Sequence, residues 1–456
     1  MRVRSISMLG LLALGLALPA MAADLVVPPL KFQQRTLDNG LQVLSLVDHS
    51  SPTVTVQVWY HVGSKDDPQG RSGFAHLFEH LMFKSTKHMP AEQMDKLTEA
   101  VGGMNNASTG DDVTNYFEVV PSNHLKTLLW AEAERLSNLT VDEKNFKSER
   151  AVVEEEYRQR VQAPPYGKLF NAIDKYSFQV HPYKRPTIGS IPELEAASLA
   201  DVRAFHKTFY RPDNATLIVV GDFDPEQMNR WVDDYFGWIG YPDSAIPKVT
   251  AKEPARTKDR SVTLTSANAP LPALAMTWLI PPARDADSIP LEVAAELLAG
   301  GKSSRLYQSL VYEEQVAQSV GVFADTRVGP GLFTAYAILA SGHTPAQARE
   351  AILAGIDELA DKPVDAAELA KVKTQMLTDA LKQRQTPMGK AFALGQATLY
   401  EGDPERANTD LAALQKVTAA DVQRVLKKYV VDAHSVTINY LPEKKKSGKA
   451  SGEAGE

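Results

Sequence analysis

The chain has 456 residues, of which 44% are apolar and 23% are charged, with a formal net charge of −7 and no cysteine. This length exceeds what one hydrophobic core organises and suits two domains. The mild negative charge offers no basic surface for nucleic acid. The lack of cysteine excludes disulfides, thiol nucleophiles and thiolate metal sites, so any metal ion must be held by nitrogen and oxygen ligands.

The first 22 residues have the three-part layout of a secretory signal. Arg2 and Arg4 precede a short apolar run at residues 8–18, and small residues flank a cleavage position after Ala22. The run is shorter than the roughly 20 residues that span a bilayer, so we interpret it as a cleaved signal and not as a membrane anchor. We therefore expect a periplasmic protein without a transmembrane segment.

The rest of the chain reads as two halves of one design. Residues 41–44 and 53–60 alternate like half-buried strands, and comparable runs occur at 261–264 and 273–279. The tryptophans of the two longer runs are 219 positions apart. Near the ends of the halves, Ser198 and Thr418 are N-caps that are 220 positions apart, and each precedes helical periodicity. Two such matches indicate internal duplication.

In the first half, the motif His76-Leu-Phe-Glu79-His80 stands within an apolar, helix-like run. Residues four apart share a helix face, so both imidazoles can point at one ion, and Glu79 reaches the same face. Two imidazoles and a carboxylate suit zinc when a further protein ligand and an open position complete a tetrahedron. The competing interpretation, histidines on a wet surface, is weakened because unpaired ionisable groups are costly in so apolar a helix.

This H-x-x-E-H order is the inverted form of the commoner H-E-x-x-H zinc motif and needs a ligand from elsewhere in the chain. The candidate segment is acidic and helix-like, and in it Glu149 and Glu156 are seven positions apart on one face. One of the two can approach the metal while the other supports a ligand from behind. Glu154 and Glu155 are interpreted as solvent-facing, although spacing alone does not choose among the four glutamates.

With these motifs the chain resembles the pitrilysin family of inverted zincins, which includes insulysin and the mitochondrial processing peptidases. The resemblance rests on the H-x-x-E-H motif, on the pair Glu149 and Glu156, and on residues 102–109 and 112–116, and it extends over the mature chain. It implies an α+β fold of two duplicated α/β halves, each a mostly antiparallel sheet with helices packed on one face.

The resemblance also implies the roles of particular residues. Glu156 becomes the third ligand of one zinc ion, beside His76 and His80, and Glu149 supports a ligand without binding the metal. The segment Asn106, Ala107, Ser108 and Thr109 becomes an edge strand beside the metal. An extended peptide substrate could add to this strand by main-chain hydrogen bonds.

The second half lacks the metal motif. At an offset of 219 its positions are taken by Ala295, Leu298 and Ala299, and at an offset of 220 by Glu296, Ala299 and Gly300. In either register the histidine pair is gone. Only the first half can hold zinc in this way, and we expect the second half to form the other wall of a cleft.

A second departure concerns an arginine and a tyrosine seven residues later, which active members resembling insulysin carry in the C-terminal half. Val311 and Gln318 stand at the corresponding positions, while Arg305 and Tyr307 are only two apart. Either this is the zinc-bearing subunit of a two-chain enzyme whose homologous partner supplies the pair, or the register is wrong. Without such a partner we expect a homodimer.

The intact motif and the resemblance together predict a zinc-dependent metalloendopeptidase that acts on peptides or unfolded polypeptides. Zinc would lower the pKa of a water molecule, and Glu79 would act as general base and pass the proton to the leaving amine. The alternative is a non-catalytic scaffold or assembly protein of the same fold. Its signature would be decayed zinc residues, and none has decayed here.

The expected organisation follows from these assignments. It comprises a signal peptide at 1–22, a zinc-binding catalytic half at 23–240, a linker at 241–260, a degenerate half without metal at 261–442 and a disordered tail at 443–456.

Overall fold

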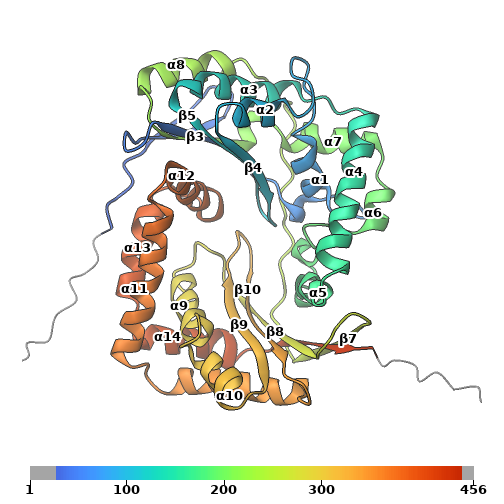
Figure 1. Ribbon diagram of the computed structural model, residues 1–456, viewed down its shortest axis with the longest axis vertical. Helices are drawn as coiled ribbons and strands as arrows, with labels where there is room; N and C mark the ends of the chain where they lie inside the picture. The colour runs from blue at the N-terminus through green and yellow to red at the C-terminus, as the bar shows by residue number, and fades with distance from the viewer. Residues whose placement is uncertain (1–26, 444–456) are drawn as a thin grey trace, which may run out of the picture.

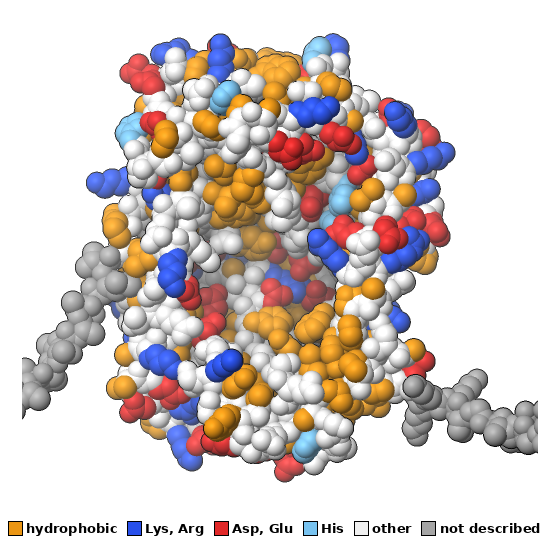
Figure 2. All heavy atoms as spheres, in the orientation of Figure 1, with side chains coloured by type: hydrophobic (Ala, Val, Ile, Leu, Met, Phe, Trp, Pro, Cys, Tyr) orange, Lys and Arg blue, Asp and Glu red, His pale blue; other side chains and the backbone are white. Residues whose placement is uncertain are grey.

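The computed structural model describes residues 27–443, so the expected signal peptide and the tail from residue 444 lie outside the described residues. Two halves, each built on its own sheet, stand one above the other around a central hollow (Figures 1 and 2). No helix within residues 27–443 combines the length and the apolar character needed to cross a bilayer.

The first half contains a six-stranded sheet in the order β1-β2-β6-β3-β5-β4, in which only the β2–β6 pair is parallel. Its strands are β1 (Gln33–Thr36), β2 (Gln42–Val47), β3 (Thr53–Tyr60), β4 (Met104–Thr109), β5 (Thr114–Pro121) and β6 (Ala215–Gly221). Its helices are α1 (Phe74–Leu81), α2 (Gln93–Glu99), α3 (Leu125–Asn138), α4 (Glu143–Tyr157), α5 (Gly167–Ser177), α6 (Ile191–Glu195), α7 (Leu199–Phe209) and α8 (Pro225–Phe236).

The second half contains a five-stranded sheet in the order β7-β11-β8-β10-β9, in which only the β7–β11 pair is parallel. Its strands are β7 (Arg260–Ser266), β8 (Ala273–Ile280), β9 (Ala317–Asp325), β10 (Gly331–Leu339) and β11 (Val436–Pro442). Its helices are α9 (Ser288–Ala299), α10 (Pro345–Asp361), α11 (Ala366–Gln383), α12 (Pro387–Gln396), α13 (Arg406–Lys416) and α14 (Ala419–Leu426).

Apart from β1, the two sheets have the same strand order, which is the expected two-half α+β layout with mostly antiparallel sheets. The matching helix starts agree in detail. Ser198 caps α7 and Thr418 caps α14, each through a reciprocal capping box with an aspartate three residues later. The duplication read from the sequence is therefore visible in both the topology and the caps.

One face of each sheet packs against helices of its own half, as expected. Strand β3 shows why, because its side chains alternate between the two faces. Val56 and Val58 join the core formed with α1 and α3, whereas Trp59 lies on the opposite face. Each sheet therefore has a second apolar face that its own helices leave uncovered.

The second face of each sheet is covered by one helix from the other half (Figure 1). Helix α12 lies on the first sheet, where Leu394 packs with Trp59 and Ile218, and helix α5 lies on the second sheet, where Leu169 packs with Ile438. The contact at α12 is close: a Cβ on Gly395 would lie 2.4 Å from the Trp59 ring. The sequence pattern had not indicated this exchange.

The segment that joins the halves, residues 237–259, has no helix or strand, but it is anchored to the body of the protein. The carboxylate of Glu253 accepts the N–H groups of three successive residues, 179–181, at 2.7–3.0 Å. Arg256 donates to the carbonyl oxygens of Thr277 and Ser177. These contacts restrict the freedom expected of a polar, proline-bearing linker.

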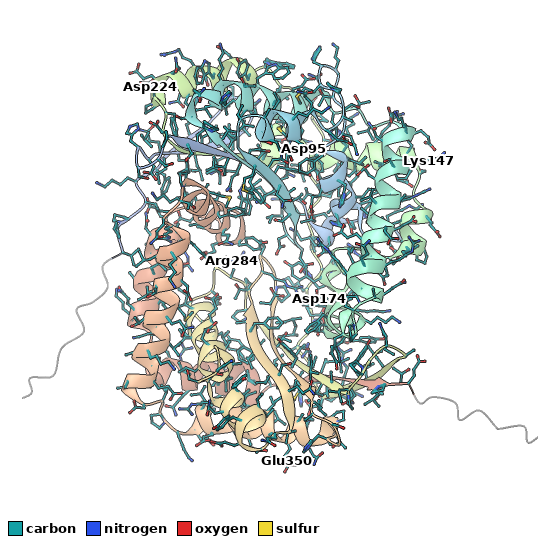
Figure 3. The ribbon with its side chains drawn as sticks, in the orientation of Figure 1. Asp95, Lys147, Asp174, Asp224, Arg284 and Glu350 are labelled. Atoms are coloured by element: carbon teal, nitrogen blue, oxygen red, sulfur yellow. The ribbon has the colours of Figure 1, made fainter. Side chains whose placement is uncertain are left out.

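A buried arginine fastens the two halves where the tips of their β-hairpins meet. Arg327, in the β9–β10 loop, lies 2.9 Å from Asp111 of the β4–β5 loop and 2.7 Å from Asp174 of α5, and it also pairs with Asp325. Asp174 lies at the level where the halves face each other (Figure 3). Burial raises the pKa of Asp174 to about 7 and also raises the pKa of Asp111.

We expect Arg327→Met to reduce the free energy of unfolding by about 3–5 kcal/mol near neutral pH, because it leaves buried carboxylates without their cation. The loss should shrink as the pH falls. Asp111 and Asp174 have folded-state pKa values above their unfolded values, so the folded variant gains stability as these groups protonate. Urea unfolding at about pH 5 and about pH 8 measures both effects.

The control for this variant is Arg230→Met, which removes an exposed arginine that pairs with Glu226 on α8. Exposed pairs of this kind contribute about 0–1 kcal/mol. An Arg327→Met loss no larger than the control, or one that is equal at both pH values, would show that the arginine does not fasten the halves.

Candidate metal site

Helix α1 carries the two histidines and is held firmly at its start. The carboxylate of Asp67 accepts the N–H groups of Gly73 and Ala75 at 2.7 and 2.9 Å. Gly73 adopts φ 95°, which favours glycine, and a Cβ there would lie 3.0 Å from the backbone oxygen of Ile188. With its apolar side chains buried in the first-half core, α1 presents its polar residues to the pocket.

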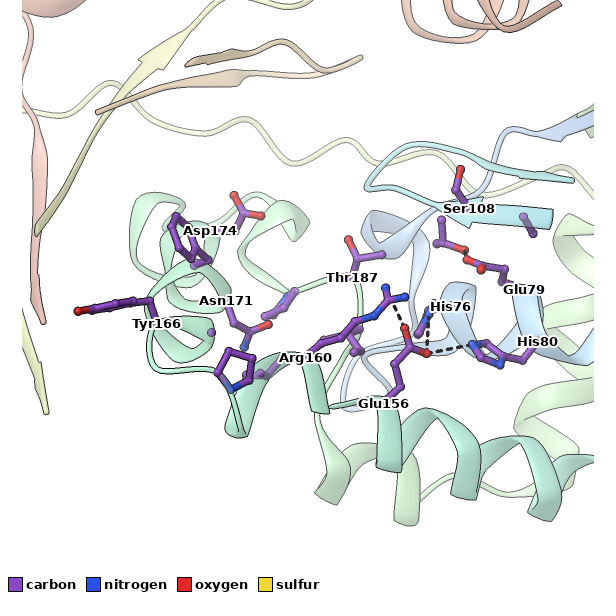
Figure 4. A pocket seen from close by; sticks show the side chains of 18 of the residues that line it. His76, Glu79, His80, Ser108, Glu156, Arg160, Tyr166, Asn171, Asp174 and Thr187 are labelled. Atoms are coloured by element: carbon purple, nitrogen blue, oxygen red, sulfur yellow. Dashed lines mark hydrogen bonds and ion pairs between the residues drawn. The ribbon is translucent and has the colours of Figure 1, made fainter. Parts of the chain in front are cut away.

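Helix α4 lies beside α1 and carries the acidic partners. Its start is fixed by Asp142, whose carboxylate accepts the N–H of Asn145 at 2.8 Å. Glu156 stands in its last turn, where Oε2 lies 3.5 Å from Nε2 of His76 and 3.2 Å from Nε2 of His80 (Figure 4). These three residues are the one group of histidine and acidic side chains in residues 27–443 whose ligand atoms converge, all within 4.8 Å of one another.

The geometry of this group fits a tetrahedral zinc ion. Ligand atoms about 2.0–2.1 Å from a tetrahedral centre lie about 3.3 Å apart. The two glutamate–histidine separations, 3.5 and 3.2 Å, are close to this value, and all three atoms lie within 4.8 Å of one another. Burial lowers the pKa of His76 to about 4, so its imidazole is neutral and can offer a lone pair. The hydrogen bond with His80 holds the pKa of Glu156 below its ordinary value, so its carboxylate is charged.

Glu79 lies in the same pocket but does not belong to the converging group. The hydroxyl of Thr109 donates to its Oε2 at 2.6 Å, so the edge strand β4 fixes this carboxylate. Burial raises the pKa of Glu79, and the hydrogen bond from Thr109 partly offsets that effect. A positioned carboxylate with a raised pKa is suited to accepting and returning a proton.

Glu149 lies behind His80, on the side away from the pocket. Its Oε1 pairs with Nζ of Lys84 at 2.9 Å, and its Oε2 is 3.9 Å from Nδ1 of His80. The longer distance exceeds a direct hydrogen bond, so the expected support of a metal ligand by Glu149 stays a prediction. Glu155 is exposed, as expected, whereas Glu154 is half-buried and lies 3.7 Å from Arg150.

The pocket at this site has a volume of about 880 Å³, and its lining comes from the first half alone. The four residues of the expected edge strand line it: Asn106, Ala107, Ser108 and Thr109. Strand β4 is the edge of its sheet and pairs only with β5, so its other side is unpaired. The second half contributes no lining residue to this pocket, so its expected role as the other wall of a cleft stays a prediction. That half lies below it, across the hollow (Figure 2).

Arg160 is a pocket residue that the sequence analysis missed. It lies in a π-helical turn (Arg158–Gln162) directly after α4, and its guanidinium is 2.9 Å from Oε1 of Glu156. The four-residue spacing from Glu156 is the usual helical ion-pair spacing and could have indicated it. Glu156 is therefore held by both oxygens, one facing the histidines and the other facing Arg160 (Figure 4).

The positions expected for an arginine and a tyrosine lie away from this site. Val311 packs against the second-half core, and Gln318 is exposed on the edge strand β9. Neither residue lines the pocket. Tyr166 does line it, but its hydroxyl donates to the carbonyl oxygen of Leu271 at 3.3 Å and is not aimed at the histidines.

We expect one zinc ion per chain, lost on His76→Ala, His80→Ala or Glu156→Gln because each change removes a converging ligand atom. Elemental analysis after dialysis measures the zinc content. Glu155→Gln is the matched control, since it alters an exposed glutamate next to Glu156 and should retain the metal. Full retention in Glu156→Gln would assign the third ligand to another residue.

Comparison with known proteins adds independent information. The family described as Insulinase (Peptidase family M16) matches residues 42–191, and the Peptidase M16 inactive domain matches residues 196–376. The zinc protease PqqE of Helicobacter pylori is 30% identical, over 90% of this chain and 93% of that protein. The probable mitochondrial-processing peptidase subunit beta of Arabidopsis thaliana is 26% identical, over 87% of this chain and 76% of that protein. The crystal structure of a protease from Helicobacter pylori superimposes with a TM-score of 0.86 at 29% identity, over 90% of this chain and 99% of that chain.

Proposed function

The chain belongs to the M16 peptidase family, whose members include zinc proteases, and from that premise we propose that it is a zinc metalloendopeptidase acting on peptides or unfolded polypeptides. The observation that carries the proposal is the convergence of His76, His80 and Glu156 at one point, with Glu79 in the same pocket. The first half is the catalytic half in this proposal, and the second half bears no metal.

In the proposed reaction, the metal ion and the side chains of the protein have different roles. Bound zinc supplies a Lewis acid that polarises the scissile carbonyl and makes a water molecule more acidic. Glu79 takes a proton from the attacking water and passes it to the leaving amine nitrogen. Thr109 holds the carboxylate of Glu79 in place for both transfers, since its hydroxyl donates to Oε2.

Strand β4 is suited to orienting the substrate. Its unpaired edge can form main-chain hydrogen bonds with an extended peptide, which would then lie beside Glu79 and the metal ligands. Main-chain pairing is indifferent to side chains, so this contact gives position and little sequence selectivity. Selectivity must come from other parts of the pocket.

We further propose that the chain is the zinc-bearing subunit of a two-chain enzyme, or failing that a homodimer, exported to the periplasm by residues 1–22. Arg160 is the one lysine or arginine among the pocket's lining residues, and its guanidinium is already paired with Glu156. A further cationic donor for the developing oxyanion is therefore missing from the lining of the described pocket. The relative in Arabidopsis is named as a subunit, which accords with a second chain.

We expect Glu79→Gln to retain zinc, because all three ligands remain, and to lower kcat by about 10²–10⁴, because an amide cannot accept the water proton. Zinc analysis and cleavage of a mixed peptide set measure the two quantities on one sample. Glu155→Gln should match the wild-type chain in both. Activity of Glu79→Gln within about tenfold of wild type would remove this residue from the role of general base.

We expect the isolated chain to be a poor peptidase and to gain about 10²–10³ in kcat from a homologous exported chain that carries the arginine–tyrosine pair. That gain corresponds to one missing oxyanion donor. The neighbouring reading frame is the first candidate for such a chain. Peptide cleavage is measured for each chain alone and for the mixture, with sedimentation to detect the complex. Equal turnover by the lone chain and the mixture would refute the two-chain arrangement.

A further inference from the structure

One end of the metal pocket is lined by an exposed aromatic side chain. Among the large apolar side chains that residues 27–443 leave exposed, Phe170 of α5 is the one that lines this pocket, and 43% of its surface is accessible. Pro164, Pro165 and Tyr166 line the pocket beside it. The inner end, with His76, Glu79 and Arg160, is charged or polar, whereas the end at Phe170 combines these apolar side chains with Asn171 and Asp174.

The apolar surface continues from Phe170 onto the second half. The ring of Phe170 meets that of Tyr336 of β10 edge to face, with centroids 5.2 Å apart, and Tyr336 is followed by Phe323 of β9 at 6.5 Å. We call Phe170, Tyr336 and Phe323 the aromatic strip. In the space-filling view, hydrophobic side chains gather on the second half beside the hollow (Figure 2).

The backbone under the strip is adapted to it. Gly321 of β9 stands opposite Tyr336 in the β9–β10 register, and a Cβ there would lie 2.4 Å from the tyrosine ring. The glycine therefore lets the ring lie against the neighbouring strand. An ordinary side chain at this position would displace Tyr336 from its contact with Phe170.

Neighbouring elements leave the two ends of the aromatic strip exposed to solvent. Helix α5 covers the second sheet over β8 and β11, and its Phe170 contacts Tyr336 of β10. Phe323, on the edge strand beyond, keeps 40% of its surface accessible. Tyr336 between them is half-buried, so the strip joins two exposed aromatic side chains across one half-buried ring, and contiguous exposed apolar surface is a feature of binding sites.

The position of the aromatic strip indicates what kind of molecule could bind to it. It begins inside the pocket that holds Glu79 and the metal ligands, so a molecule that contacts both ends must present a polar reacting group and an apolar group. A peptide paired with β4 does so, because in an extended chain alternate side chains leave the backbone on the same side about 6–7 Å apart. Its main chain would lie beside Glu79 while one side chain would extend toward Phe170.

We propose that the aromatic strip is a substrate subsite that receives a large apolar side chain, preferably aromatic, of an extended peptide whose scissile bond lies at the metal site. The proposal deepens the proposed function and rests on it. The strip supplies the selectivity that main-chain pairing with β4 lacks. It also gives the metal-free second half a direct contact with substrate, through Tyr336 and Phe323.

The test separates binding from catalysis. The zinc-loaded Glu79→Gln chain should bind peptides and cleave them too slowly to disturb the measurement. Its affinity is measured by fluorescence anisotropy for two labelled peptides. One is a polar peptide of about twelve residues with a single phenylalanine, and the other carries serine in its place. We expect the phenylalanine peptide to bind about tenfold more tightly, in line with the modest selectivity of apolar pockets. We expect Phe170→Ser to abolish that difference.

Two variants control the measurement. Tyr312→Ser removes an aromatic side chain that is 73% exposed in the second half but lies outside the pocket, and it should leave the preference unchanged. Phe170→Tyr should retain the preference, which distinguishes a subsite from a general effect on folding. If Phe170→Ser does not fold, Phe323→Ser at the far end of the strip provides the same readout.

The outcomes are distinct for the two proposals. Loss of the preference in Phe170→Ser, with retention in Tyr312→Ser, supports the subsite. Equal binding of both peptides by the parent chain, or an unchanged preference in both Phe170→Ser and Phe323→Ser, overturns it. A clear preference in binding, with no cleavage by the wild-type chain either alone or mixed with its homologous partner chain, leaves the apolar binding site standing and refutes the peptidase. Cleavage without any aromatic preference in binding refutes the subsite and leaves the peptidase standing.

Discussion

The exchange of α5 and α12 between the halves is the constraint on which the rest of the structure depends. Each sheet has two apolar faces and helices of its own half for only one, so neither half buries its core without the other. Helix α5 packs on the second sheet and also lines the metal pocket, so the contact between the halves affects the pocket. Leu169 and Ile173 pack on the second sheet, while Phe170 and Asn171 line the pocket. The shape of the pocket is therefore set by a contact between the halves.

The two halves use the same helix position differently. Helix α1 keeps a polar face toward the pocket, whereas α9, at the matching place in the second half, buries Ala294, Ala295, Leu297 and Leu298. Buried ionisable groups are costly unless they are paired or bind a metal, so a helix that lost the ligands is more stable with apolar replacements. The second half supports α5 and carries the loop with Arg327.

The sequence predicted the parts of this protein that repeat or follow a helical period. The apolar run around His76 predicted the polar face of α1. The spacing of Glu149 and Glu156 predicted that both lie on one face of α4. The offsets near 220 indicated the duplication. Contacts between distant elements have no such period. The exchange of helices, the hydrogen bond from Thr109 to Glu79 and the strip from Phe170 to Phe323 each depend on tertiary packing, which one sequence does not encode locally.

The pairing of Arg160 with Glu156 bears on how many atoms the chain offers to a metal. Because Oε1 of Glu156 is held by the guanidinium, this carboxylate presents only Oε2 toward the histidines. Three protein atoms then converge, which is the count typical of catalytic zinc sites; structural sites use four. Glu79 stays outside the converging group because Thr109 holds it against β4. In a zinc-bound chain, the contact of Arg160 with Glu156 and that of Thr109 with Glu79 would leave one coordination position for water.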